Sequence, residues 1–151
     1  MNNLISCIVS NAKTYFKNRK TSFYIGFGLA IVSIVVSLYY VIAYAGVKDF
    51  RIETFLFTFF GGLAYLALSF FKLNNVGALI LGVFDFFAML IFLRTYYPVV
   101  IESDVMSGNF NITPEIANLI VITVILLVTS VTANVLAWMK NDKKEEGGTG
   151  K

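Results

Sequence analysis

Four long apolar runs constrain the fold of this chain more than any other feature. They cover residues 23–46, 54–71, 76–97 and 116–139, and the first and last contain no Asp, Glu, Lys or Arg. A helix needs roughly 17 to 25 residues to cross a hydrocarbon core about 30 Å thick. Backbone polar groups in lipid must be satisfied within the segment itself, so each run is predicted to be a transmembrane α-helix. The predicted fold is an all-α membrane protein with a bundle of four transmembrane helices.

The composition agrees with this prediction and leaves little chain for a separate soluble domain. Of the 151 residues, 58% are hydrophobic and 14% are charged, whereas soluble domains are about 25% charged. We therefore divide the chain into an N-terminal segment (residues 1–20), a transmembrane domain (21–140) and a C-terminal tail (141–151). The tail, NDKKEEGGTGK, is polar and rich in Gly, so it is predicted to be disordered.

The N-terminal segment has two interpretations. Apolar residues recur in it at spacings that place them on one side of a helix: Leu4, Ile8, Ala12, Tyr15 and Phe16. This pattern predicts a short amphipathic helix that lies in the membrane interface, with its Lys residues near anionic head groups. The alternative is an irregular start that only contributes positive charge to its side of the membrane.

The distribution of Lys and Arg predicts the orientation in the membrane. Nine of the twelve basic residues flank one side of the predicted helices: Lys13, Lys17, Arg19, Lys20, Lys72, Lys140, Lys143, Lys144 and Lys151. The other side holds Lys48, Arg51 and Arg94. Cytoplasmic loops carry the excess of positive charge. Both termini are therefore expected in the cytoplasm, and the membrane is expected to be a plasma membrane, specifically a bacterial inner membrane.

Two prolines predict helix ends on the outer side. Pro98 is expected to end the third helix, because proline cannot donate to the backbone ladder and clashes with the preceding turn. Pro114 follows Thr113 and precedes Glu115, which is the order of an N-cap hydroxyl, a proline at the first helical position and an acid in the first turn. The fourth helix is therefore expected to begin at this proline.

Each predicted helix carries one stripe of small or polar residues at helical spacing. Lipid tails are as apolar as leucine, so transmembrane helices associate through close approach at small residues and through interhelical hydrogen bonds. We expect close helix packing at Gly26, Gly61, Gly62 and Gly82. Ordinary packing of the bundle explains these stripes, and a continuous hydrated path is the alternative.

Asp85 is the only acid in the middle of an apolar run, and it is predicted to lie near the middle of the membrane. Arg94 lies nine residues further, on the opposite side of the same helix, so it cannot neutralise this carboxylate. An unpaired carboxylate costs at least about 2.5 kcal/mol at that depth, so Asp85 is expected to be partly protonated and to donate to a hydroxyl or carbonyl. The candidate intramembrane polar site consists of Asp85, Ser33, Ser37, Thr129, Ser130 and Asn134.

Several functions are excluded by what the sequence lacks. With one Cys and no His, we expect no metal site and no cofactor. Phosphate-binding Gly loops and nucleophile motifs are missing, so no catalytic residues, no enzymatic activity and no nucleic-acid partner are expected. Two hypotheses stay open. The chain is an accessory or assembly subunit that acts through helix packing and binds a membrane protein or a second copy of itself. The alternative is a minimal proton- or cation-coupled transporter or channel that uses Asp85.

Overall fold

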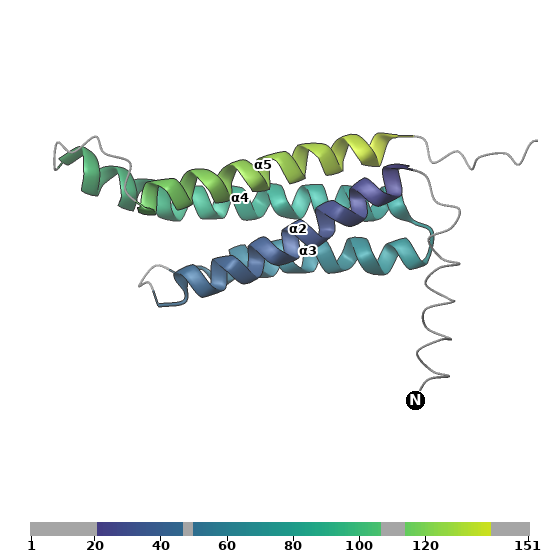
Figure 1. Cartoon of the computed structure of the whole chain (residues 1–151), viewed down its shortest axis with the longest axis horizontal. Helices are drawn as coiled ribbons and strands as arrows, with labels where there is room; N and C mark the ends of the chain where they lie inside the picture. Colours follow the sequence, from purple (N-terminus) through teal and green to yellow (C-terminus); the bar gives the residue numbers. More distant parts are fainter. Residues whose placement is uncertain (1–20, 47–49, 107–113, 140–151) are drawn as a thin grey trace, which may run out of the picture.

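The computed structural model describes residues 21–46, 50–106 and 114–139, and these form four helices without a strand (Figure 1). The helices are α2 (Thr21–Tyr44), α3 (Ile52–Phe70), α4 (Asn74–Met106) and α5 (Pro114–Trp138). Each contains a stretch long and apolar enough to cross a membrane. The prediction of an all-α fold with four helices able to cross a membrane is therefore confirmed for the described residues. Helices α3 and α4 begin two residues before the predicted apolar runs (52 against 54, 74 against 76).

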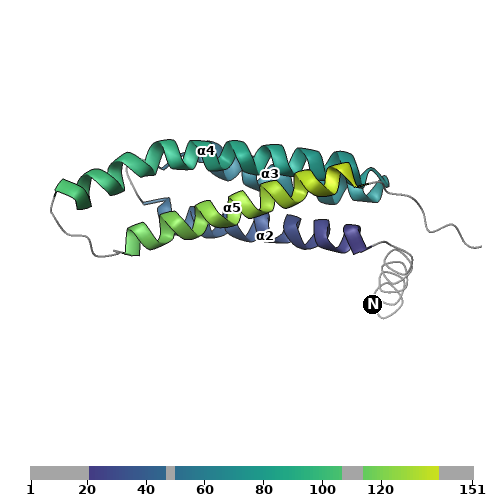
Figure 2. The ribbon, with the colours of Figure 1, turned by 90° about the horizontal axis from the view of Figure 1, so that it is seen from above.

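The helices run alternately in opposite directions and lie side by side (Figures 1 and 2). Among the described residues, α4 packs along both α3 and α5, while α2 packs mainly on α3 and less on α5 and α4. Helices α3 and α5 do not contact each other there. Because α3 and α5 stay apart, α2 reaches α4 across the centre of the bundle. That crossing places Asp85 opposite α2.

The prediction that Pro98 ends the third helix is wrong. Helix α4 continues through Pro98 to Met106, and it extends beyond the neighbouring end of α5 (Figure 2). Proline removes one backbone donor and bends a helix, but long apolar helices tolerate it where the freed backbone group finds another partner.

Helix α5 is described from Pro114 onward, and Thr113, its predicted N-cap, lies outside the described residues. The predicted amphipathic helix of residues 1–20 and the predicted disordered tail of residues 141–151 lie outside the described residues. Their interpretations therefore stay predictions.

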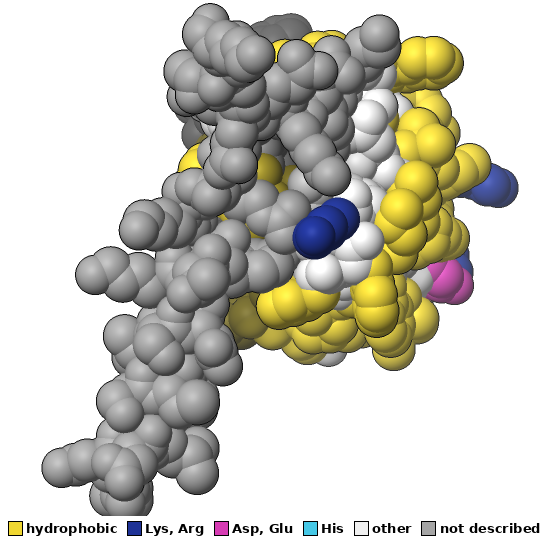
Figure 3. All heavy atoms as spheres, turned by 90° about the vertical axis from the view of Figure 1, so that its right-hand side faces the viewer, with side chains coloured by type: hydrophobic (Ala, Val, Ile, Leu, Met, Phe, Trp, Pro, Cys, Tyr) yellow, Lys and Arg dark blue, Asp and Glu magenta, His cyan; other side chains and the backbone are white. Residues whose placement is uncertain are grey.

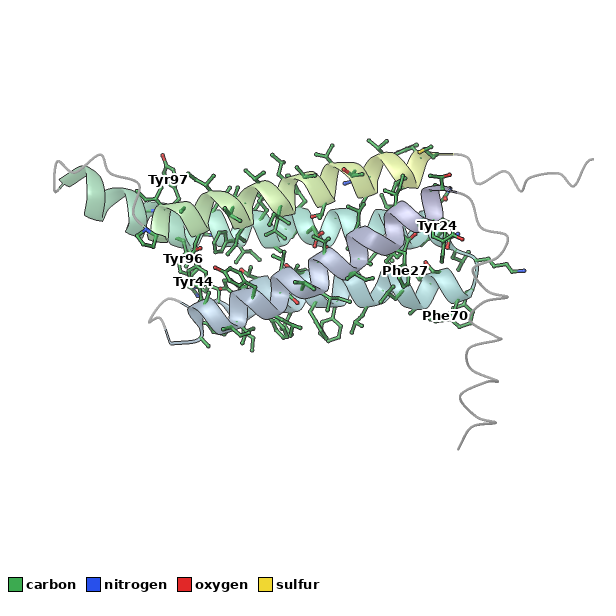
Figure 4. The ribbon with its side chains drawn as sticks, in the orientation of Figure 1. Tyr24, Phe27, Tyr44, Phe70, Tyr96 and Tyr97 are labelled. Atoms are coloured by element: carbon green, nitrogen blue, oxygen red, sulfur yellow. The ribbon has the colours of Figure 1, made fainter. Side chains whose placement is uncertain are left out.

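The surface of the bundle is apolar along its length, as lipid contact requires. Large exposed side chains include Ile42 on α2, Phe60 on α3, Val83 on α4 and Val131 on α5. Hydrophobic side chains cover the flank that is visible from the end where α3 turns into α4 (Figure 3). Tyr44, Tyr96 and Tyr97 lie near one end, and Tyr24, Phe27 and Phe70 lie near the other (Figure 4). Aromatic residues at both ends are typical of the two membrane interfaces.

The turn between α3 and α4 holds a lysine in the left-handed region, where glycine is usual. Lys72 has φ 62°. Its N–H donates to the Ser69 carbonyl (3.2 Å) and the Leu73 N–H donates to the Leu68 carbonyl (3.0 Å), which is the bonding pattern of a Schellman motif. The left-handed conformation costs a residue with a Cβ about 1 kcal/mol. Lys72 therefore places a positive charge in this turn at a cost in conformational stability.

We expect Lys72→Gly to be about 1 kcal/mol more stable than Lys72→Ala, because only glycine relieves the clash of the Cβ with its own backbone. Both variants remove the same charge, so the difference between them isolates the conformation. Unfolding by SDS in mixed micelles, followed by circular dichroism, measures it. Equal midpoints for the two variants would mean that the left-handed residue carries no strain.

Candidate functional site

Asp85 lies at the centre of the bundle with its side chain 0% exposed. The Ser33 hydroxyl of α2 donates to Asp85 Oδ2 of α4 over 2.7 Å. This bond joins the two helices that meet diagonally across the bundle. Two of the predicted polar-site residues are therefore in direct contact, although 52 positions separate them in the sequence.

The carboxyl group belongs to a thin polar layer between two hydrophobic clusters. One cluster includes Val36 of α2, Ala88 of α4 and Leu126 of α5. The other includes Ala30 of α2, Leu81 of α4 and Ala133 of α5. On each of these helices the polar residue lies between the two cluster members: Ser33, Asp85 and the pair Thr129 and Ser130. Apolar packing on both sides keeps the layer away from the membrane surfaces.

The second carboxyl oxygen, Asp85 Oδ1, is buried and has no hydrogen-bond partner among the described residues. Thr129 of α5 supplies another hydroxyl next to the carboxyl group. Its only short hydrogen bonds run to the Ile125 and Leu126 carbonyls of its own helix, both 3.0 Å. Because a hydroxyl hydrogen rotates about its C–O bond, the Thr129 hydroxyl can donate either to these carbonyls or to the carboxyl group beside it.

Ser130 and Gly82 join α5 to α4 beside this layer. The Ser130 hydroxyl donates to the Gly82 carbonyl (2.7 Å). A Cβ on Gly82 would lie 3.0 Å from the Ser130 carbonyl oxygen and 2.6 Å from Asn134 Nδ2. The absent side chain of Gly82 thus allows the two backbones to approach and makes the hydroxyl bond possible.

Ser37 and Asn134, which the sequence also placed in the polar site, bond within their own helices. The Ser37 hydroxyl donates to the Ile34 carbonyl (2.7 Å). Asn134 Nδ2 donates to the Ser130 carbonyl (2.9 Å). Neither side chain bonds to Asp85. The set of polar residues around the carboxyl is therefore smaller than predicted. It consists of Ser33 and Thr129, with Ser130 bonded to the nearby Gly82 carbonyl.

The other three predicted glycines also lie where helices approach closely. A Cβ on Gly62 would lie 2.9 Å from the Ala30 carbonyl oxygen and 2.7 Å from Ile34 Cγ1, which fixes the distance between α2 and α3. A Cβ on Gly61 would lie 3.0 Å from Phe84 Cβ. A Cβ on Gly26 would collide with the Tyr65 ring. Each of these glycines is buried.

The described helices place no Lys or Arg side chain beside Asp85. α2 and the described length of α5 contain no Lys or Arg. Arg94 of α4 is exposed and lies nine residues further along. Within the described ranges, no group of three His, Cys, Asp or Glu side chains could hold a metal ion. The carboxyl is thus surrounded by hydroxyl oxygens and apolar side chains.

Two sets of tyrosine hydrogen bonds in the bundle were not predicted from the sequence. The Tyr40 hydroxyl donates to the Arg51 carbonyl (3.0 Å) and accepts from the Arg51 N–H (3.1 Å), so it ties the start of α3 to α2. The Tyr39 hydroxyl donates to Asn118 Oδ1 of α5 (3.0 Å). The sequence signal was weak, since tyrosines near a helix end equally indicate an interfacial belt.

Removal of the Ser33 hydroxyl should destabilise the bundle more than removal of the Ser37 hydroxyl. Ser33→Ala removes the hydrogen bond that joins α2 to Asp85 of α4, so we expect a loss of about 1 kcal/mol. Ser37→Ala deletes only a bond within one helix turn, and we expect less than about 0.5 kcal/mol. SDS-induced unfolding compares the two variants. Equal losses would show that the bond between α2 and α4 contributes nothing specific.

No protein-family model, curated protein or solved structure matches this chain.

Proposed function

We propose that this protein is an accessory or assembly subunit of the plasma membrane, which acts through helix packing and binding to another membrane protein. The observation that carries the proposal is the use of the buried polar groups. Ser33 bonds to Asp85 across α2 and α4, and Ser130 bonds to Gly82 across α5 and α4. Hydroxyls bound in this way hold helices in a fixed arrangement, as a subunit that presents a defined surface requires.

The proposed orientation has both termini in the cytoplasm of a bacterial cell, with the protein in the inner membrane. Lys72 supports it, because this residue lies in the turn between α3 and α4, at the same end of the bundle as the start of α2 and the end of α5 (Figure 1). Fusion of a reporter that is active only outside the cytoplasm tests it. Fusions after Trp138 should be inactive, and fusions between α2 and α3 should be active.

Extraction from the native membrane in a mild detergent tests the accessory role. We expect the tagged chain to copurify with one other membrane protein at a fixed ratio that persists in several detergents. Mass measurement of the intact complex gives the ratio. Recovery of the chain as a monomer without any partner would contradict the accessory role.

A second function, proton- or cation-coupled transport through a small bundle or a dimer, is favoured by one observation. Asp85 Oδ1 is buried and lacks a partner among the described residues, and an ionisable group inside a membrane is by default a candidate ion site. Purified protein in liposomes should then support a flux that Asp85→Asn abolishes and Ser37→Ala preserves. A flux that Asp85→Asn leaves unchanged would remove Asp85 from any transport mechanism.

A further inference from the structure

The turn between α3 and α4 lies at the boundary between the hydrocarbon core of the membrane and the lipid head groups. α3 contains 19 residues, so it is about 28 Å long, and a hydrocarbon core is about 30 Å thick. The last residue of α3, Phe70, therefore lies at the edge of the core, at one end of the bundle (Figure 4). Residues 71–73 alone separate α3 from α4. Such a short turn cannot extend away from the membrane surface.

Lys72 is held at this boundary between two apolar side chains. Phe71 is 75% exposed and Leu73 is 48% exposed, and Lys72 is exposed between them. The N–H groups of all three residues donate to carbonyls in the last turn of α3, so the backbone of the turn is fixed. At this depth the apolar side chains reach acyl chains, and the ammonium group of a lysine extends to the level of the lipid phosphates.

The backbone of Lys72 indicates independently that the lysine side chain has a use. Lys72 is the one non-glycine residue in the described ranges with a positive φ, 62°. Glycine adopts this conformation without a steric cost and is the usual residue at this position of a helix end. Strained backbone conformations are concentrated at functional sites. Lysine supplies what glycine cannot, a cation at a fixed point of the membrane surface.

The acidic residues of the described helices lie away from this turn. Glu53 lies in the first turn of α3, at its opposite end, and Asp85 is 0% exposed near the middle of the bundle. The remaining acids lie near the end of α4 and at the start of α5, at positions Glu102, Asp104 and Glu115. Within the described ranges, Lys72 therefore has no carboxylate to neutralise it, and an anion from outside these helices fits beside it.

We propose that the turn between α3 and α4 binds an anionic phospholipid, with the Lys72 ammonium on the lipid phosphate and with Phe71 and Leu73 against acyl chains. A single lysine at a membrane surface favours anionic over zwitterionic lipid by about fivefold. The proposal goes beyond both proposed functions, because the lipid would bind in the same way to a subunit and to a transporter. Its test needs neither a partner protein nor a flux.

The experiment places a fluorescent probe in the turn and measures which lipid touches it. Trp138 is the sole tryptophan of the chain, so Phe71→Trp combined with Trp138→Phe gives the full chain one probe, and both positions are largely exposed. The protein is reconstituted in vesicles of phosphatidylglycerol and phosphatidylcholine in equal parts, with bromine on the acyl chains of one lipid or the other. Bromine quenches tryptophan only on contact, so free phosphate ions give no signal. The ratio of the two quenching efficiencies gives the preference for phosphatidylglycerol.

We expect Lys72→Gln to lower this preference by about fivefold, and Lys72→Arg to preserve it. Glutamine keeps a Cβ in the left-handed position, so the variant changes the charge and leaves the backbone cost in place. Arg94→Gln is the matched control, because Arg94 is exposed and lies about 30 Å along α4 from its start. It should leave the preference at the probe unchanged.

An unchanged preference in Lys72→Gln would overturn the proposal, because the anion beside Lys72 would then not be a lipid. Equal losses in Lys72→Gln and Arg94→Gln would overturn it as well, since net charge and not the turn would attract the lipid. Native mass spectrometry repeats the test without an introduced tryptophan. In detergent with both lipids in equal amounts, the unaltered chain should retain phosphatidylglycerol about fivefold more than Lys72→Gln does.

Discussion

Gly82→Val should be the most destabilising single substitution in the bundle, with an expected loss of about 3 kcal/mol. The new Cβ would lie 3.0 Å from the Ser130 carbonyl oxygen and 2.6 Å from Asn134 Nδ2. The amide of Asn134 is the end of a side chain and can move, but the Ser130 carbonyl belongs to the α5 backbone. The two helices must separate, and the hydrogen bond from Ser130 to the Gly82 carbonyl is then lost as well.

Gly28→Val is the matched control for this prediction. Gly28 lies on α2, is exposed, and a Cβ there would meet nothing within 4 Å. We expect a change within about 0.5 kcal/mol. Unfolding in SDS, monitored by circular dichroism in the same mixed micelles, measures both variants. Similar midpoints for Gly82→Val and Gly28→Val would show that α4 and α5 do not approach closely at this glycine.

Gly62→Val should have the second largest effect, an expected loss of about 2 to 3 kcal/mol, by separating α2 from α3. A Cβ there would lie 2.9 Å from the Ala30 carbonyl oxygen, which is backbone and cannot yield alone. Since Ala30 precedes Ser33 by one helical turn, movement of α2 should also draw the Ser33 hydroxyl away from Asp85. The variant should therefore shift the infrared C=O band of the Asp85 carboxyl group, which a difference spectrum against Asp85→Asn isolates, as well as the unfolding midpoint.

Ala67→Val is the control on the same helix, because Ala67 of α3 is exposed. It should leave both the midpoint and the carboxyl band unchanged. A normal carboxyl band in a destabilised Gly62→Val would mean that α2 keeps its contact with α4 when it leaves α3. The packing of α2 on α3 would then not position Ser33.

The main elements of the fold follow from the sequence because lipid imposes one rule on every long apolar run. Backbone groups in hydrocarbon must bond within a helix, so the runs at residues 23–46 and 116–139 were expected to form α-helices. The four glycines were predicted for a similar reason, since close approach in a membrane requires small residues. Gly62 and Gly82 lie at such approaches. The end of α4 was not predicted, because Pro98 weakens a helix by an amount that neighbouring groups can offset.

The composition of the polar layer could be predicted only in part. Helical spacing places Ser33 and Ser37 on one face of α2, but it does not say which hydroxyl bonds to another helix. The structure directs Ser33 to Asp85 and Ser37 to the Ile34 carbonyl. Which of the two serines lies level with Asp85 depends on how far α2 is shifted along its axis relative to α4. That shift depends on the loops and on the packing at Gly62. Likewise, Thr129 and Asn134 of α5 were both predicted in the polar site, but only Thr129 lies beside the carboxyl.

Labelling from the lipid phase tests most directly the central claim that four membrane helices turn Asp85 toward one another. A photoactivated carbene reagent dissolved in the bilayer, followed by peptide mass spectrometry, reports which side chains touch acyl chains. Val83, Phe86 and Phe87 are exposed on α4 and should be labelled, whereas Asp85 and Ala88, both 0% exposed, should not. Labelling of Asp85 at the level of Phe86 would contradict the account, because the carboxyl would then face lipid or a partner instead of Ser33.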